Sequence, residues 1–514
     1  MTSIPARNPF PARGTCELGE SFLPHARRQW SRYQPTARLS GVQGALRLAD
    51  DYIRDFGRDG ALGCLYGAHG AGKTHAACRM MASIDAVDRR AVQFYLRFDN
   101  DDFVTAYRRL ASSLTQDALT DLCLRYLGVL AVEWAEQHGS AAQLEEVHAA
   151  IRNEPSMVLE LFDAGDADYN AVLEAQAREI SIAVGDGAQF QRALSFLLRP
   201  EFSHAAYDWL CGRAISPGNA LAMGVDPQLD DPQRCRYALQ LLAALTTRGG
   251  APFVLVLDQC EKFLLHDGTL LPRNSTLLQN LAETIPLAGG LLLLVCNLAG
   301  WDLMPPDLRQ RLASAAHRLP LLTPHEAELL LTAYTGAARG LFTDDAVREL
   351  LRQSGGNVRR FLQLSWLGYE RGFSRAPIGV ETIARSVPGS ARCPELTELA
   401  MLLEARLLAA GLVVERSGNG EEFVSFGLPD SRDPQVLITL SKALYADDHR
   451  FAEAGRKDGR AAFTSVLISG YASPPVLTGL SRLAHVVLVA DGSPEFSRRL
   501  DTLVEQVAAA LGRH

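Results

Sequence analysis

Short apolar runs alternate with longer amphipathic stretches over the first 300 residues. The runs are almost wholly apolar, as expected for strands that are buried on both faces of a parallel sheet. They are residues 61–66, 91–98, 252–260 and 291–297. Helical spacing covers residues 39–56 and most of 100–250, and we interpret the latter as a large helical insertion. The pattern predicts an α/β fold built on a parallel sheet.

The rest of the chain divides into stretches with different patterns. Residues 323–380 are helical, with two Thr residues in N-cap positions, which predicts a helical lid. Residues 390–430 give a helix and two strands around a Ser-Gly-Asn-Gly turn, which predicts a winged helix. Three short strands and an amphipathic helix predict a small separate α/β domain at 434–514. Residues 1–38 are expected to form an extended arm before a core domain at 39–322.

Composition places the chain among multidomain globular proteins. It has 514 residues, of which 47% are hydrophobic and 21% are charged. The net charge of −8 means that binding to nucleic acid would need a local basic face. No signal peptide or membrane-spanning run is present, and the nine cysteines form no CxxC or Cys/His cluster. We therefore expect a cytoplasmic protein without a zinc site or a membrane partner.

A glycine-rich loop at residues 67–74 carries the clearest chemistry. It reads Gly-Ala-His-Gly-Ala-Gly-Lys-Thr, satisfies G-x-x-x-x-G-K-[ST], and lies between a predicted strand and a predicted helix. Its glycines permit a turn whose N–H groups form an anion nest at a helix N-terminus. Lys73 would neutralise the β- and γ-phosphates, and the Thr74 hydroxyl would ligate Mg²⁺. The sequence thus predicts a P-loop that binds a nucleoside triphosphate with Mg²⁺.

Carboxylates follow the third apolar run. Asp258 ends this run, where a carboxylate would hold the Mg²⁺ shell together with Thr74. Glu261 follows three residues later and is either a general base for water or a capping carboxylate of the next helix. Many P-loop proteins that hydrolyse their nucleotide carry Glu directly after the Asp, but here that position is Gln259. Fast hydrolysis is therefore not expected.

Polar residues further along the chain are candidates for contact with phosphate. Asn297 ends the fourth apolar run and could bond the γ-phosphate or its attacking water, or simply end the strand. Arg309 and Arg311 could act on the nucleotide of a neighbouring subunit or form a solvated helix face. Arg359 opens a lid helix, and its guanidinium suits phosphate oxygens. The residues expected to contact nucleotide are Gly67, His69, Gly70, Ala71, Gly72, Lys73, Thr74, His75 and Arg359.

The order of these features resembles AAA+-type and STAND-type P-loop ATPases. GAHGAGKT, VLVLDQCE, LLLLVCN, RQR and GGNVRR follow one another as in those families, over about residues 40–375. The resemblance implies ATP as the nucleotide and makes Asp258 the Walker B residue. It also implies that Asn297 is sensor 1, Arg311 a candidate arginine finger and Arg359 sensor 2. The Asp-Gln-x-Glu sequence is closer to STAND switch ATPases.

Two weaker features resemble the P-loop ATPases of BREX-like bacterial defence systems. They are Arg13-Gly14-Thr15 near the N-terminus and AAYDWLCG at 205–212. In those proteins a Trp-Leu-x-Gly element precedes Walker B, and Trp209 would match it. The alternative is that Trp209 is a buried core residue with no special role.

Three functions are compatible with the sequence. The first is a slowly hydrolysing regulatory switch ATPase that acts on an unknown protein partner or effector, in bacterial defence or mobile-element conflict. The second is a DNA-binding AAA+ ATPase of replication initiation or transposition, which would use the winged helix to contact DNA. The third is a nucleotide-bound scaffold with little hydrolysis. An arginine finger acting on a neighbouring subunit would imply a homo-oligomer.

Overall fold

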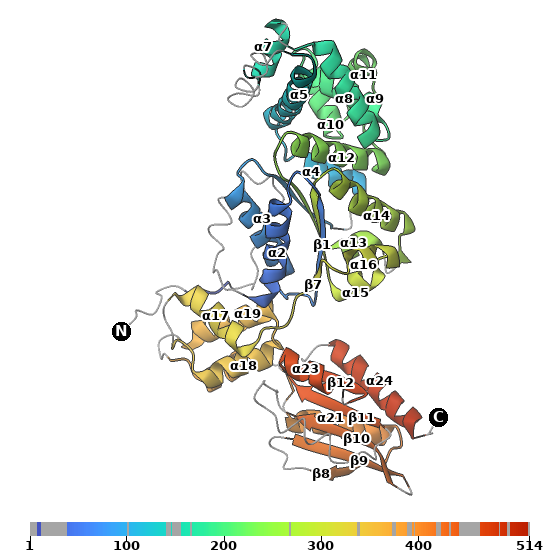
Figure 1. Ribbon diagram of the computed structural model, residues 1–514. Helices are drawn as coiled ribbons and strands as arrows, with labels where there is room; N and C mark the ends of the chain where they lie inside the picture. Colours follow the sequence, from blue (N-terminus) through green and yellow to red (C-terminus); the bar gives the residue numbers. More distant parts are fainter. Residues whose placement is uncertain are drawn as a thin grey trace.

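A computed structural model of the chain shows three structured regions joined in a row, namely a core with a parallel sheet and a helical insertion, a helical lid and a C-terminal sheet (Figure 1). The structure describes residues 8–11, 39–99, 102–139, 145, 147, 156–164, 167–266, 269–336, 340–372, 377–387, 393–394, 396–417, 423–430, 433–441, 463–482, 484–490 and 494–511.

A five-stranded parallel sheet forms the centre of the core, in the order β2-β3-β6-β1-β7. The four predicted apolar runs supply four of these strands, and β7 was not predicted. The strands are β1 (Ala61–Tyr66), β2 (Val92–Arg97), β3 (Phe253–Asp258), β6 (Leu291–Cys296) and β7 (Ala316–Arg318). The predicted P-loop parallel sheet is thereby confirmed.

Both faces of this sheet are buried, as the continuous apolar runs predicted. Along β6, Leu292 and Leu294 pack with the insertion, whereas Leu293 and Val295 pack with the helices of the other face. Those helices are α2 (Ser40–Arg54) and α3 (Lys73–Val87). Around β3 and β6 the chain also forms α13 (Cys260–Leu264), β4 (Leu265–His266), β5 (Thr269–Leu270), α14 (Pro272–Leu287), α15 (Leu298–Leu303) and α16 (Pro306–Leu312).

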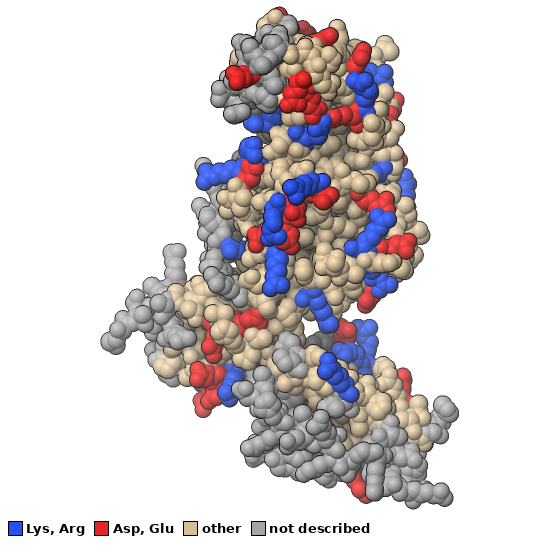
Figure 2. All heavy atoms as spheres, viewed as in Figure 1, with Lys and Arg blue, Asp and Glu red and all other residues tan. Residues whose placement is uncertain are grey.

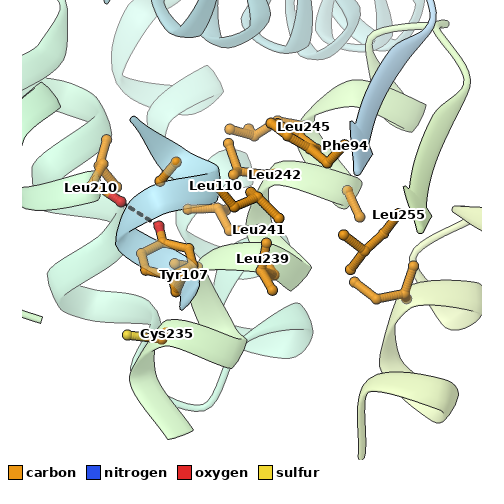
Figure 3. Packing of buried hydrophobic residues seen from close by; sticks show 14 of the residues in the cluster. Phe94, Tyr107, Leu110, Leu210, Cys235, Leu239, Leu241, Leu242, Leu245 and Leu255 are labelled. Carbon is orange, nitrogen blue, oxygen red and sulfur yellow. Dashed lines mark hydrogen bonds between the residues drawn. The ribbon is translucent and has the colours of Figure 1, made fainter. Parts of the chain in front are cut away.

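In the described residues of the predicted insertion between β2 and β3, all regular elements are helices. Figure 3 shows how Tyr107 and Leu110 of α4 lie among leucines of α12, with Phe94 of β2 and Leu255 of β3 beside them. The Tyr107 hydroxyl donates to the carbonyl of Leu210. The helices are α4 (Phe103–Ala111), α5 (Gln116–His138), α7 (Met157–Ala164), α8 (Tyr169–Ala183), α9 (Gly187–Leu197), α10 (Ser203–Leu210), α11 (Pro217–Met223) and α12 (Pro232–Arg248).

Trp209 of α10 is a core residue of this insertion. Its side chain is fully buried, its ring packs edge-on against Phe190, and its Nε1–H donates to the carbonyl of Asp226 at 2.8 Å. These contacts agree with the interpretation of Trp209 as a buried core residue. Residues 13–15, the other part of the likeness to defence-system ATPases, lie outside the described residues.

The lid contains α17 (Pro324–Thr335), α18 (Asp344–Ser354), α19 (Val358–Gly372) and α20 (Val380–Ser386). The predicted capping box at the start of α17 is present, with Thr323 and Glu326 bonded to each other's backbone N–H. Glu326 also accepts from Ser40 at the start of α2, which fixes α17 to the core. In the arm, Phe10 is buried in the lid's hydrophobic cluster; residues 1–7 and 12–38 lie outside the described residues.

The expected division between a winged helix at 390–430 and a separate domain at 434–514 is wrong. Both stretches form one sheet, in the order β12-β11-β10-β9-β8. The predicted boundary, between residues 430 and 434, separates β9 from β10, although these two strands pair with each other, and α21 shares its hydrophobic cluster with α24. The elements are α21 (Leu396–Ala409), β8 (Glu415–Ser417), β9 (Phe423–Asp430), β10 (Asp433–Ser441), β11 (Phe463–Ser469), α23 (Pro474–Leu480), β12 (Val486–Ala490) and α24 (Pro494–Ala510).

Among the helices of the described residues, none combines the length and the apolar character needed to cross a membrane.

Candidate nucleotide-binding site

The P-loop joins the end of β1 to the start of α3 at the carboxyl edge of the sheet. Gly70 and Gly72 have φ of 79° and 93°, a region that favours glycine, and a Cβ on Gly70 would lie 2.6 Å from the Asn357 side chain. The Lys73 ammonium donates to the carbonyls of Gly67 and Ala68 at 3.0 and 2.9 Å. The lysine is therefore folded back onto the loop that would cradle the phosphates.

Asp258 lies beside the P-loop helix, as predicted for a Walker B residue. Its side chain is 3% exposed, and its Oδ2 accepts from the Thr74 hydroxyl at 2.7 Å. The Tyr95 hydroxyl of β2 donates to the same oxygen at 2.6 Å. The Gln259 N–H donates to Oδ1 at 2.8 Å. The structure thus brings together Thr74 and Asp258, the two oxygen donors expected to hold Mg²⁺, and this donor set suits a hard cation.

The turn after Asp258 is strained. Gln259 has φ of 60°, the only positive φ of a non-glycine residue in the described part of the chain. Its Oε1 is buried without a hydrogen-bond donor. The turn starts α13 directly after the strand and places Glu261 in the first turn of this helix. Strain and an unpaired buried oxygen at one position are typical of a functional site.

Glu261 and Asn297 are joined to each other. Glu261 Oε2 accepts from the backbone N–H of Asn297 at 3.1 Å. The Asn297 side chain accepts from the Gly300 N–H at 2.7 Å and caps α15. Because β6 lies between β1 and β3, Asn297 follows the strand between the P-loop and Asp258. Its position fits the prediction, while its side chain acts as a helix cap in this structure.

The lid reaches the P-loop through the loop before α19. The Asn357 side chain donates to the carbonyl of His69, and the Arg359 N–H donates to the carbonyl of Gly70 at 3.1 Å. The guanidinium of Arg359 lies 2.7 Å from His69 Nε2. Since a guanidinium only donates, Nε2 must be the acceptor and His69 must be neutral. We call this set of contacts the lid clasp.

Two cations, Lys73 and Arg359, lie close to the neutral His69 at the clasp. Burial, followed by the charges of Arg359 and Lys73, lowers the pKa of His69. Burial also lowers the pKa of Lys73, although Glu261 and Asp258 oppose this effect. Burial and the nearby Arg97 lower the pKa of Arg359, whose Nε is buried without an acceptor. A bound polyphosphate would supply further negative charge and an acceptor for the Arg359 guanidinium.

Ala71 lies within the P-loop and His75 directly follows it, whereas the predicted arginine finger, Arg311, lies away from it. Ala71 is buried in the hydrophobic cluster beneath the loop, and His75 lies in the first turn of α3, where burial lowers its pKa. Arg311 is ion-paired with Glu283 at 2.7 Å and lines a cleft with Gly57, before β1. Arg311 is therefore at the opposite edge of the sheet from its own P-loop. Its role towards a neighbouring subunit stays a prediction.

The sequence did not indicate Tyr95 or Asn357. Tyr95 lies two residues before the end of β2, and this strand pairs with β3 so that Arg97 is level with Asp258. A polar residue near the carboxyl end of a predicted parallel strand was the available signal for Tyr95. For Asn357 the available signal was the sequence Gly-Gly-Asn directly before the lid helix that carries Arg359.

Comparisons with known proteins give distant structural similarities only. No family model matches the chain, and no curated protein matches its sequence. The solved ORC2 protein of Aeropyrum pernix, in ADPNP-ADP complexes, is 13% identical over 94% of this chain and 98% of that chain, with a TM-score of 0.40. Cdc6p of Pyrobaculum aerophilum is 14% identical over 79% and 78%, with a TM-score of 0.38. Drosophila ORC bound to DNA is 13% identical over 82% and 79%, with a TM-score of 0.34.

The neutral state of His69 predicts a pH dependence of the clasp. Because its pKa lies below the ordinary 6.5, the folded protein binds fewer protons than the unfolded chain between those two values. The stabilisation is therefore complete above about pH 6.5 and is lost as the pH falls towards the lowered pKa. We expect the unfolding temperature of the wild type to drop more between pH 7.5 and pH 5.5 than that of His69→Gln, which keeps a neutral acceptor. Parallel pH profiles would contradict this account.

Proposed function

We propose that the chain is an ATP-binding, slowly hydrolysing regulatory ATPase of the AAA+ or STAND type, whose nucleotide state controls the position of the lid. The lid clasp is the observation that carries the proposal. Asn357 and Arg359 contact the backbone and side chain of the loop that would hold the phosphates. A phosphate in that loop would compete with His69 for the Arg359 guanidinium and so change the lid's contacts, which is the differential interaction that a switch requires.

The residues at the sheet edge have distinct roles in this proposal. Lys73 would leave the carbonyls of Gly67 and Ala68 to neutralise the phosphates, while the N–H groups of the loop bind their oxygens. Thr74 and Asp258 would hold Mg²⁺, which when bound stabilises negative charge on the phosphate oxygens. Arg359 would exchange His69 for a phosphate.

Slow turnover follows from the surroundings of Glu261. Its carboxylate already accepts from the Asn297 N–H, so the candidate base is partly engaged. Gln259 holds the position directly after Asp258, and an amide does not act as a general base at neutral pH. Such a site favours long residence of the triphosphate over rapid cycling.

Two variants separate binding from hydrolysis. Lys73→Ala removes the charged hydrogen-bond donor, and we expect ATP affinity to fall by about 10- to 100-fold. Glu261→Gln keeps an oxygen for the Asn297 N–H but removes the base, so affinity should be unchanged while kcat falls by about 100-fold or more. Calorimetric titration and a phosphate-release assay measure the two quantities.

Arg90→Ala is the matched control for loss of a cation, since Arg90 forms an exposed ion pair with Asp88 beyond the far end of α3. Absence of turnover in the wild type and in both site variants, with ATP binding retained in the wild type, would favour the scaffold with little hydrolysis. Absence of ATP binding in the wild type would contradict the proposal.

DNA binding is the second candidate function, and one of the similar solved structures, Drosophila ORC, is described as bound to DNA. In this chain, the helix and strands expected to form a winged helix belong to the C-terminal sheet. On the face shown in Figure 2, described Lys and Arg residues are interspersed with Asp and Glu. We therefore rank this function below the nucleotide switch.

Binding to a random duplex at 50 and 200 mM salt distinguishes the two functions. Phosphate contacts would give affinity that falls steeply with salt, by about 1000-fold or more for six or more contacts. The switch predicts no such binding with or without ATP. Steep, salt-dependent binding that requires ATP would favour the DNA-handling ATPase.

A further inference from the structure

One aromatic side chain of the C-terminal sheet is inserted into the lid. Tyr471 follows β11, yet it is fully buried in the hydrophobic cluster of the lid together with Leu351 and Phe361. Its hydroxyl donates to the carbonyl of Leu322, just before α17. In Figure 1 the end of the C-terminal sheet that carries α23 lies against the lid. By its position in the sequence Tyr471 belongs to the C-terminal sheet, but its ring packs in the hydrophobic cluster of the lid.

Two glycines allow the ring to enter. Gly356 has φ of 72°, and a Cβ there would lie 2.7 Å from the ring of Tyr471. Gly470 has φ of 86°, and its Cβ would lie 2.5 Å from the carbonyl of Arg352. Neither position can accept a side chain without movement of backbone or ring. The fit leaves Gly356 no room to shift towards Tyr471.

Polar contacts hold the same junction. The Arg352 guanidinium lies 3.4 Å from the Ser469 hydroxyl and is ion-paired with Glu349, with 12% and 13% of these two charged side chains exposed. Ser469 donates to the carbonyl of Pro394 at 2.6 Å. The Gln353 side chain accepts from the Cys393 N–H at 3.1 Å. The end of β11 and the segment before α21 are therefore both attached to the last turn of α18.

The lid clasp begins directly beside this junction. The carbonyl of Gly356 accepts from the Leu322 N–H at 2.9 Å, next to the bond from Tyr471. The following residue, Asn357, bonds the P-loop carbonyl of His69, and Arg359 bonds Gly70. A single short segment is thus packed against the Tyr471 ring at one end and bonded to the P-loop at the other.

We propose that Tyr471 is an autoinhibitory pin: it holds residues 356–359 in the position where Arg359 contacts His69, and nucleotide binding releases it. This inference rests on the proposed function. In this position the Arg359 guanidinium is engaged with His69, and the ring beside Gly356 resists movement of the segment that carries Arg359. By linkage, the pin lowers ATP affinity and bound ATP loosens the C-terminal sheet from the lid by the same free energy.

The test measures ATP affinity of the full chain with Mg²⁺ by calorimetric titration. Tyr471→Ala should bind ATP at least about fivefold more tightly than the wild type, the lower end of typical coupling. Tyr471→Phe keeps the ring and should stay close to the wild type. Tyr369→Ala is the matched control, because Tyr369 is buried in the same cluster but packs against Phe10 in place of Gly356. If Tyr471→Ala does not fold by circular dichroism, Tyr471→Leu replaces it.

A double-mutant cycle shows whether the effect runs through the clasp. In an Arg359→Ala background, Tyr471→Ala should no longer tighten ATP binding, since the residue that it restrains is gone. Unchanged or weaker binding by Tyr471→Ala, or equal tightening by Tyr369→Ala, overturns the pin while leaving the proposed ATPase intact. Failure of the wild type to bind ATP overturns the proposed function itself.

Discussion

The parallel pairing of β1, β6 and β3 is the constraint on which the candidate site depends. Tyr66 is level with Cys296, and Asp258 is level with Val295, so the P-loop, Asn297 and Asp258 all emerge at one edge. Fully buried side chains on both faces of β6 hold this register. A slip by one residue would turn Asp258 to the other face and would separate it from Thr74. The chemistry of the site is thus fixed by apolar packing beneath it.

Above this edge, Lys73 and Arg359 lie partly buried beside the neutral His69. Lys73, His69 and Arg359 are held close together, and burial lowers the pKa of each. The lid clasp offsets this cost with hydrogen bonds to the loop, and the Tyr471 ring keeps the clasp in place. A polyphosphate would offer better partners to the two cations, Lys73 and Arg359, so binding and rearrangement of the lid are expected to occur together. These contacts are the basis of the proposed ligand-controlled switch.

The sequence predicted the parts of this arrangement that depend on local patterns. The P-loop, the four apolar strands, the helical insertion and the lid helices follow from short motifs and periodicity, and the structure contains them. Contacts between distant segments were not predictable in the same way. Tyr95 reaches Asp258 over 163 positions of the chain, and Asn357 reaches His69 over 288. The winged-helix prediction failed for the same reason, since the partner of β9 lies beyond the expected boundary, in β10.

The central claim is that nucleotide in the P-loop changes the contacts of the lid and, through them, those of the C-terminal sheet. Hydrogen exchange of the full chain with and without Mg²⁺ and ATP measures this most directly. The account predicts altered protection at residues 67–75, 354–360 and 469–473, and much smaller changes at all of them in Lys73→Ala at an ATP concentration near the wild-type Kd. A change confined to 67–75 in the wild type would contradict it.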